Sequence, residues 1–178
     1  MTKELRLALI GFGNVGRAFA SLLMQKETTL LNEYGLKPRV TGIITARHGA
    51  AIDPDGIDLS KALSLVEAKQ SLAPLSKIAF EGNTIDFIKT CPADVLFETT
   101  PVNPQAGTPA IDHLQAGFEA NMHGVTANKG PVVYAYQKLN NLAASKGLKF
   151  RFESAVMDGA PIFSLHRNTL AGAEIEGF

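Results

Sequence analysis

Gly11-Phe12-Gly13-Asn14-Val15-Gly16 is the stretch that decides the fold of this chain. The residues before it, from Leu5 to Ile10, are mostly apolar and long enough to form one buried strand. The apolar residues after it recur at the spacing of one helix face: Val15, Ala18, Phe19 and Leu22. A G-x-G-x-x-G turn between a strand and a helix is typical of a dinucleotide-binding fold.

Each glycine of this motif has a physical task. Gly11 permits a tight turn, Gly13 lets the backbone approach a pyrophosphate, and Gly16 lets the helix lie close to the strand. The free N–H groups and the positive dipole end at the start of the helix favour a phosphate. A glycine turn without a ligand is the alternative that the motif by itself leaves open. The residues predicted to hold the pyrophosphate are Gly11, Phe12, Gly13, Asn14, Val15 and Gly16.

Composition and charge narrow the class of protein. The chain has 178 residues, which is expected for one domain with an appendage or for one domain cut from a longer protein, and its hydrophobic content of 46% allows a sizeable core. Lysine plus arginine and aspartate plus glutamate number 17 each, and no basic run indicates nucleic-acid binding. No apolar run reaches membrane-spanning length, and the first residues do not form a secretory signal. We therefore expect a cytoplasmic protein with neither nucleic-acid nor membrane partners.

The single cysteine, Cys91, excludes an intramolecular disulfide and a cysteine-rich metal site. It stands next to Pro92, and no histidine near it in the sequence would activate it. We therefore interpret Cys91 as a structural residue and not as a nucleophile.

Strand-like and helix-like segments alternate along the rest of the chain. The segments that predict strands are residues 40–45, 93–98, 124–127 and 149–154. The segments that predict helices are residues 59–72, 84–89, 132–146 and the one opened by Thr108-Pro109. Residues 28–38 and 50–58 are expected to be connections. This alternation predicts an α/β fold with a doubly wound, mainly parallel sheet of the Rossmann type.

Local signals mark several helix ends. Asn83 or Thr84 is expected to cap the helix over 84–89, and Gly147 to close the helix over 132–146. Thr108 is expected as the N-cap of the next helix, with Pro109 as its first residue. The apolar face of that helix is formed by Ile111, Leu114 and Phe118, which predicts an outward position for His113.

The end of the second strand bears on the choice of cofactor. NAD sites of this kind usually place an acidic residue here for the ribose hydroxyls, whereas NADP sites place a cation near the extra phosphate. This chain has no carboxylate in Thr45-Ala46-Arg47-His48, and Arg47 can pair with a phosphate while His48 can add a donor. We therefore favour NADP over NAD, with a solvated loop arginine as the alternative.

Two more strand ends carry candidate functional residues. Ligands of open α/β sheets lie beyond the carboxyl ends of the strands, so Thr99, Thr100 and Pro101 are candidate cofactor contacts, mainly through their backbone. Asn128-Lys129 follows the strand over 124–127, which places a lysine where it can act on a carbonyl or a carboxylate. A surface lysine before a Gly-Pro turn is the alternative.

Three separated stretches resemble one enzyme family, the homoserine dehydrogenases. They are Ile10 to Gly16, Val125 to Pro131 and Glu153 to Pro161, in matching order and spacing. The resemblance implies NAD(P)-dependent interconversion of L-homoserine and L-aspartate 4-semialdehyde, a step toward threonine and methionine. Another oxidoreductase acting on a related semialdehyde fits the second and third stretches less well.

The resemblance also implies roles for residues. Thr99 and Thr100 would lie by the ribose and the nicotinamide, and Arg47 by the 2′-phosphate. Asn128 and Lys129 would complete the cofactor contacts, and Lys129 would orient the substrate and stabilise charge on its oxygen. A monovalent cation, often sodium in the family, would take oxygen ligands from Glu153, Val156, Asp158 and Ala160.

The family pattern further implies how the chain is organised. Residues 1–150 would form the NAD(P)-binding domain, and residues 151–178 the start of the connection into a substrate and dimerisation domain. That domain is absent from this chain, so we expect cofactor binding to survive better than turnover. The full-length protein is expected to be a homodimer or larger. The alternative function is a stand-alone NADP(H)-binding or regulatory module without catalysis.

Overall fold

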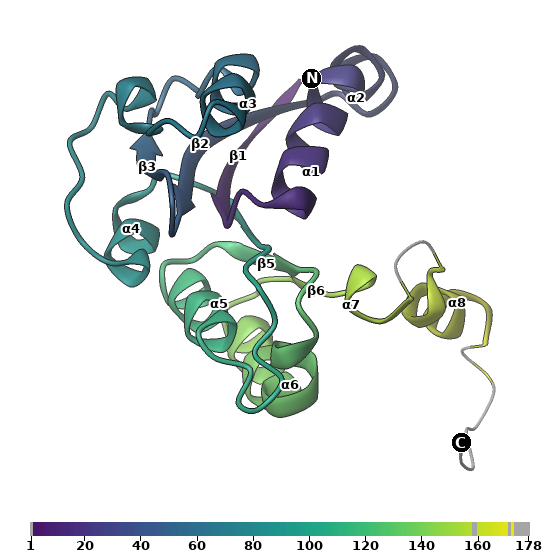
Figure 1. Cartoon of the computed structure of the whole chain (residues 1–178). Helices are drawn as coiled ribbons and strands as arrows, with labels where there is room; N and C mark the ends of the chain where they lie inside the picture. Colours follow the sequence, from purple (N-terminus) through teal and green to yellow (C-terminus); the bar gives the residue numbers. More distant parts are fainter. Residues whose placement is uncertain (1, 158–159, 171, 173–178) are drawn as a thin grey trace.

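The sheet of the molecule is wound as the sequence predicts (Figure 1). The computed structural model describes residues 2–157, 160–170 and 172. Within these residues, six strands form one sheet in the order β3-β2-β1-β4-β5-β6. Neighbouring strands are parallel except for β2 and β3, which are antiparallel. The strands are β1 (Lys3–Ile10), β2 (Leu36–Thr45), β3 (Gly49–Ile52), β4 (Val95–Glu98), β5 (His123–Thr126) and β6 (Phe150–Arg151). The predicted α/β Rossmann-type fold is confirmed.

Helices cover both faces of the sheet. They are α1 (Asn14–Gln25), α2 (Glu27–Tyr34), α3 (Leu59–Glu67), the short 3-10 helix η1 (Ala73–Leu75), α4 (Thr84–Thr90), α5 (Ala110–Glu119), α6 (Lys129–Ser145), α7 (Ser154–Met157) and α8 (Ile162–Thr169). Side chains of β1 alternate between two hydrophobic cores. Ala8 and Ile10 pack in the core that contains α4, α5 and α6 side chains, and Leu7 and Leu9 in the one that contains α1 and α3 side chains.

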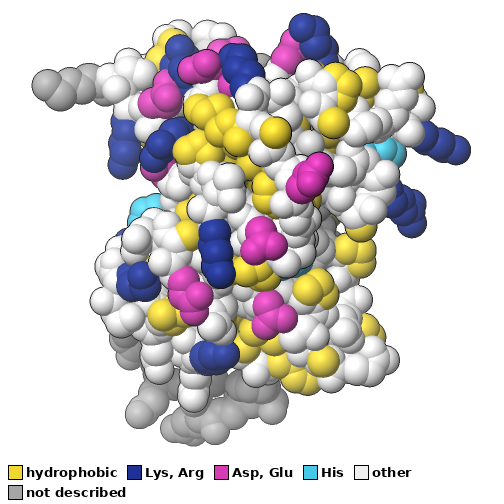
Figure 2. Space-filling model, turned by 90° about the vertical axis from the view of Figure 1, so that its left-hand side faces the viewer, with side chains coloured by type: hydrophobic (Ala, Val, Ile, Leu, Met, Phe, Trp, Pro, Cys, Tyr) yellow, Lys and Arg dark blue, Asp and Glu magenta, His cyan; other side chains and the backbone are white. Residues whose placement is uncertain are grey.

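The surface carries charged side chains of both signs (Figure 2), as the equal numbers of basic and acidic residues lead one to expect. On the face shown in Figure 2, basic and acidic side chains are interspersed over the surface. No helix in the described part of the chain combines the length and the apolar character needed to cross a bilayer.

Two expected connections contain regular structure instead. Residues 28–38 hold most of α2 and the first part of β2, and residues 50–58 begin inside β3. Proline has no backbone N–H to donate to a neighbouring strand, yet Pro38 stands within β2. It is tolerated because β2 is paired there on one side alone, with Leu5 of β1, and β3 joins the other side of β2 only from Gly42 onward. β3 was missed because it is short and consists of glycine and alanine apart from Ile52, which gives little strand signal.

Side-chain caps explain the start of α4 and of α6 but not the start of α5. The predicted cap of α4 is confirmed, since Asn83 and Asp86 form a reciprocal capping box. α6 begins at Lys129, earlier than expected, because the side chain of Asn128 accepts a hydrogen bond from the N–H of Gly130 at 2.9 Å. The expected start of α5 was wrong: this helix begins at Ala110, with Pro109 in the N-cap position and without a side-chain cap.

Further deviations concern the end of the chain. The strand expected over 149–154 is reduced to Phe150–Arg151, and α7 begins after two intervening residues, at Ser154. The left-handed Gly147, with φ of 68°, ends α6 as predicted.

Cys91 is buried and packs against β2, which fits its interpretation as a structural residue. A Cβ atom added to Gly42 would lie 2.3 Å from the Cys91 sulfur, so β2 and the thiol touch directly. Burial raises the pKa of the Cys91 thiol to about 11, which keeps it in the unreactive neutral form near neutral pH.

We predict that a thiol reagent added at pH 8 leaves Cys91 unmodified in the folded chain. The reagent reaches only thiolate that is exposed to solvent, and this thiol is both protonated and buried. The measurement is the rate of modification with and without denaturant. Equal rates in the two conditions would contradict the buried position.

Candidate functional site

The carboxyl ends of β1, β2, β4 and β5 meet at one edge of the sheet. The N–H of Gly11 donates to the carbonyl of Ile44 at 2.9 Å, and the N–H of Thr99 donates to the carbonyl of Ile10 at 2.8 Å. The N–H of Ala127 donates to the carbonyl of Glu98 at 3.3 Å. The loops that carry the predicted site residues are therefore neighbours, as the rule for ligand sites in open α/β sheets requires.

Two glycines of the motif are required by the fold itself. Gly11 has a φ of 92°, and a Cβ atom there would lie 2.9 Å from the carbonyl group of Thr99. A Cβ atom on Gly16 would lie 2.7 Å from the carbonyl oxygen of Gly11, which shows how closely α1 approaches the turn. Neither position has room for a larger residue.

Gly13 differs from both. Its φ is −79°, which any residue can adopt, and no atom of the described chain lies within 4 Å of a Cβ atom built there. Packing and backbone conformation therefore give no reason for a glycine at this position. The open space beside Gly13 lies over the start of α1, where a pyrophosphate is expected to bind.

The start of α1 has unsatisfied donors. No side chain caps it and no acidic residue stands in its first turn. By contrast, side chains cap α3, α4 and α6, namely Asp58, Asn83 and Asn128. The first N–H groups of α1 and its positive dipole end are thus available to an anion, which fits a dinucleotide.

The other residues of the motif contribute unequally. The side chain of Phe12 is buried in the core, so only its backbone can face a ligand. Val15 is exposed next to the turn. Arg17, which the sequence analysis missed, donates to the Asn14 side-chain oxygen at 2.8 Å and adds a cation to the first turn of α1. Its place directly after Gly16 is the signal that could have singled it out.

Arg47 and His48 lie in the tight turn between β2 and β3. Arg47 is exposed, and it makes no hydrogen bond or ion pair within the part of the chain that the structure describes. The ring nitrogen Nδ1 of His48 lies 2.9 Å from the carbonyl oxygen of Gln70, and its backbone N–H donates to the Thr45 hydroxyl at 2.7 Å. His48 is therefore held in place, whereas the guanidinium of Arg47 is available.

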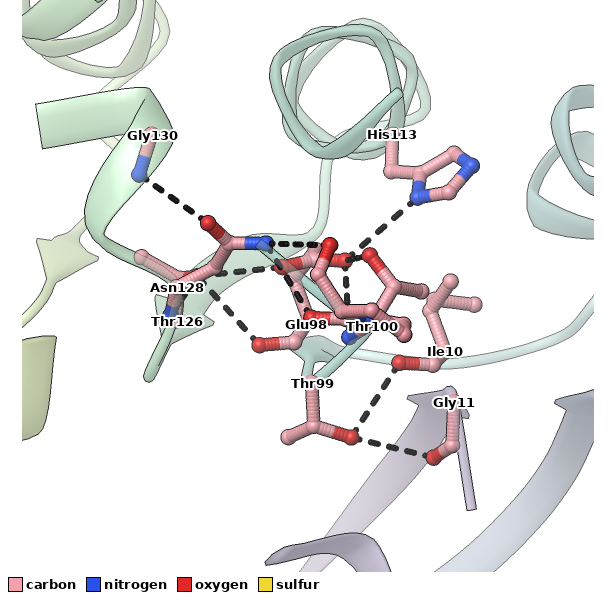
Figure 3. Close-up of polar contacts among 10 residues, drawn as sticks. Ile10, Gly11, Glu98, Thr99, Thr100, His113, Thr126, Asn128 and Gly130 are labelled. Carbon is pink, nitrogen blue, oxygen red and sulfur yellow. Dashed lines mark hydrogen bonds and ion pairs between the residues drawn. The ribbon is translucent and has the colours of Figure 1, made fainter. Parts of the chain in front are cut away.

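Loop 99–101 is tied to its neighbours by most of its polar groups (Figure 3). The Thr99 hydroxyl donates to the carbonyl of Gly11 at 3.0 Å, and the N–H of Thr100 donates to the Glu98 carboxylate at 3.1 Å. The side-chain amide of Asn128 donates to the carbonyls of Thr100 and Pro101 at 3.1 and 3.3 Å. The loop thus supports the glycine turn from one side and α6 from the other.

Asn128 and Lys129 have different surroundings. Asn128 is only 2% exposed, and its side-chain oxygen and nitrogen are both engaged within the protein. Lys129 is the first residue of α6 and is exposed at the same edge of the sheet. The structure therefore gives Asn128 the task of holding the backbone from which the Lys129 side chain extends.

His113 does not lie on an outer face, and that expectation was wrong. It is 5% exposed, and its Nδ1 lies 3.5 Å from Oε1 of Glu98 (Figure 3). The reason is that α5 packs against α4 and α6 as well as against the sheet, which buries most of its circumference. Glu98 itself was missed, although a glutamate closing the apolar run Val95-Leu96-Phe97 is an unusual feature.

The predicted cation ligands lie at the far end of the chain. Both carboxylate oxygens of Glu153 accept hydrogen bonds from Ser164, at 2.9 Å from its N–H and 2.8 Å from its hydroxyl. The N–H of Ser164 holds the pKa of Glu153 below its usual range. Val156 belongs to α7, and the N–H of Ala160 donates to the carbonyl of Met157 at the end of that helix. Asp158 lies outside the described residues.

These contacts show no assembled cation centre. Among the residues that the structure describes, no three or more His, Cys, Asp or Glu side chains gather as metal ligands. The arrangement of Glu153 instead resembles a carboxylate that satisfies free N–H groups at the start of α8.

Comparison with known proteins identifies relatives of one kind. No family model matches the chain. The chain is 39% identical to the homoserine dehydrogenase of Methanocaldococcus jannaschii, covering 95% of this chain and 50% of that protein. It is 34% identical to the NAD(+)-dependent homoserine dehydrogenase of Pseudomonas canavaninivorans, covering 98% and 50%.

Solved structures agree with the sequence relatives. The crystal structure of homoserine dehydrogenase from Thermoplasma acidophilum matches with a TM-score of 0.78 and 25% identity over 96% of this chain and 49% of that one. A hyperthermophilic archaeal homoserine dehydrogenase in complex with NADPH matches with a TM-score of 0.77, 24% identity and coverage of 95% and 50%. The chain thus spans about half the length of the relatives it matches, and the family resemblance found in the sequence is confirmed.

Proposed function

We propose that this chain is the nicotinamide-dinucleotide-binding half of a homoserine dehydrogenase. The observation that carries the proposal is the open, uncapped start of α1 beside Gly13, in a chain whose relatives are homoserine dehydrogenases. The reaction would interconvert L-homoserine and L-aspartate 4-semialdehyde. Residues 1–150 would form the cofactor domain, and residues 151–178 would begin the connection to a substrate and dimerisation domain.

The residues at the strand ends would divide the work of this reaction. When bound, the dinucleotide supplies the nicotinamide carbon that accepts or returns a hydride. The first turn of α1 would hold its pyrophosphate, and loop 99–101 would lie by the ribose and the nicotinamide. Lys129 would orient the substrate and stabilise negative charge on the oxygen whose carbon gains or loses the hydride. This assignment is favoured by the exposed position of Lys129 next to that loop.

We further propose that NADP is preferred over NAD. The names of the relatives include both an NAD(+)-dependent enzyme and a complex with NADPH, so the family admits either cofactor. Arg47 supports the preference here because it is exposed in the turn that follows β2, and no carboxylate stands in that turn.

Replacing Arg47 by alanine is expected to weaken NADP⁺ binding by about tenfold and to leave NAD⁺ binding unchanged, since one charged hydrogen-bonding partner of the 2′-phosphate is lost. Calorimetric titration with both dinucleotides measures the two affinities. Arg151→Ala, which removes an exposed arginine on β6, serves as the control. An unchanged ratio of affinities in Arg47→Ala would refute the assigned role.

A sodium ion near Glu153, Val156, Asp158 and Ala160 is also proposed, on the family resemblance of residues 153–161. Because Ser164 occupies both oxygens of Glu153, such an ion would have to share or replace these hydrogen bonds. Sodium-dependent thermal stability, measured against choline as the replacement cation, tests the site.

The proposed activity needs a test in two parts. This chain should bind NADP⁺ or NAD⁺ in a calorimeter, and the full-length enzyme should reduce the dinucleotide with homoserine as substrate. The full-length enzyme is expected to be a homodimer or larger. Binding without any turnover by the full-length protein would favour the alternative, a dinucleotide-sensing module without catalysis.

A further inference from the structure

Glu98 is a carboxylate with no contact to solvent, located at the end of β4. Its exposed fraction is 0%, and burying a carboxylate is costly unless its oxygens are paired. Oε1 accepts from the N–H of Thr100 at 3.1 Å and from the hydroxyl of the same residue. Oε2 accepts from the hydroxyl of Thr126 at 3.2 Å, and this second partner lies on the neighbouring strand, β5 (Figure 3).

The backbone N–H of Asn128 fixes the direction of the hydrogen bonds that the Thr126 hydroxyl makes. The N–H of Asn128 can only donate, and it donates to the Thr126 oxygen at 3.0 Å. The hydroxyl proton of Thr126 is then free to point at Glu98, whose side chain and carbonyl it reaches at 3.2 and 3.3 Å. A continuous chain of contacts therefore runs from Glu98 through Thr126 to Asn128.

This chain of contacts closes into a ring. The amide nitrogen of Asn128 donates to the carbonyls of Thr100 and Pro101, and Thr100 is itself bound to Glu98. The ring therefore joins loop 99–101 to the start of α6, where Lys129 is the first residue. Glu98 is the member of the ring that accepts hydrogen bonds both from loop 99–101, through Thr100, and from β5, through Thr126.

His113 approaches the carboxylate from α5. Its Nδ1 is buried without a hydrogen-bond partner among the described residues, and the nearest acidic oxygen is Oε1 of Glu98 at 3.5 Å. A helix, a loop and two strands thus converge on one acidic group (Figure 3). A core of the same shape could be filled by apolar side chains, so stability alone is a weak reason for this arrangement.

We propose that Glu98 is a positioning residue, whose buried carboxylate fixes loop 99–101 against the Asn128-Lys129 segment and so sets where the nicotinamide meets Lys129. This inference rests on the proposed function, because it takes the dinucleotide to lie with its nicotinamide at loop 99–101. Glu98 touches neither cofactor nor substrate, and it acts through Thr100, Thr126 and Asn128.

The test compares two ligands that differ only in the nicotinamide. One is the oxidised dinucleotide that the unsubstituted chain binds, and the other is the matching ADP-ribose compound, which keeps the pyrophosphate and the adenosine half. In Glu98→Gln, the amide NH₂ group replaces one carboxylate oxygen. That NH₂ group would then face a hydrogen-bond donor of Thr100 or Thr126, and the hydrogen bond would be lost. Binding of the dinucleotide is expected to weaken about tenfold, while binding of the ADP-ribose compound stays within about twofold.

Two further variants separate positioning from general damage. Thr126→Val removes the hydroxyl between Glu98 and Asn128 at nearly constant shape, and it should reproduce the selective loss even if Glu98→Gln folds poorly. Glu119→Gln changes an exposed glutamate on α5 and should bind both ligands as the unsubstituted chain does.

Other outcomes overturn the inference. Equal losses for both ligands in Thr126→Val would show a general structural effect, and unchanged binding of both would show no effect on the site. If the unsubstituted chain binds neither ligand, the proposed function fails first, and this inference fails with it.

Discussion

Replacing Gly13 by alanine is expected to weaken dinucleotide binding about 100-fold while leaving the fold and its stability unchanged. Apart from the two neighbouring residues, the methyl group meets no atom of the described residues within 4 Å, and the φ of −79° suits alanine as well as glycine. It would instead occupy the space through which a pyrophosphate reaches the N–H groups of α1. Loss of charge-assisted hydrogen bonds to the phosphates would lower affinity by about 100-fold.

Calorimetric titration and thermal unfolding measure the two halves of this prediction. Gly172→Ala is a matched control, because no atom of the residues that the structure describes lies within 4 Å of a Cβ atom there either. Gly16→Ala should behave differently from both, since its methyl group would lie 2.7 Å from the Gly11 carbonyl oxygen and would destabilise the fold. Unimpaired binding by Gly13→Ala would mean that no pyrophosphate lies at the start of α1.

Replacing Lys129 by alanine in the full-length enzyme is expected to lower kcat by about 100-fold or more and to change cofactor affinity little. Positively charged groups that stabilise developing charge on a substrate oxygen contribute effects of this size. The side chain of Lys129 is exposed, and the N-cap of α6 is made by Asn128, so the substitution leaves the hydrogen bonds of the ring untouched.

Steady-state kinetics with homoserine, together with cofactor titration, tests this role. Lys138→Ala provides the control, because Lys138 is an exposed lysine farther along α6. If Lys129→Ala and Lys138→Ala both retain normal turnover, Lys129 is a surface residue without a part in the chemistry.

Local signals in the sequence were sufficient to predict the glycine turn between β1 and α1. The apolar strand, the glycine spacing and the amphipathic helix are all set by near neighbours, so β1, the turn and α1 were predicted at their observed places. The same holds for the cap of α4 by Asn83 and for the lysine that follows β5. Each of these features depends on residues only a few positions apart.

The sequence by itself therefore determined the fold class, the glycine turn between β1 and α1, and the edge of the sheet at which the candidate residues gather. The tertiary structure alone decided which glycines of the motif the fold itself requires, Gly11 and Gly16, and that Gly13 has open space beside it. These differences depend on tertiary contacts such as that of Gly11 with Thr99. It also decided that His113 is buried against Glu98, since a helix packed on several sides loses the polar face that its periodicity predicts. Contacts between residues distant in the chain leave no periodic pattern in the sequence, which is why only the folded molecule reveals them.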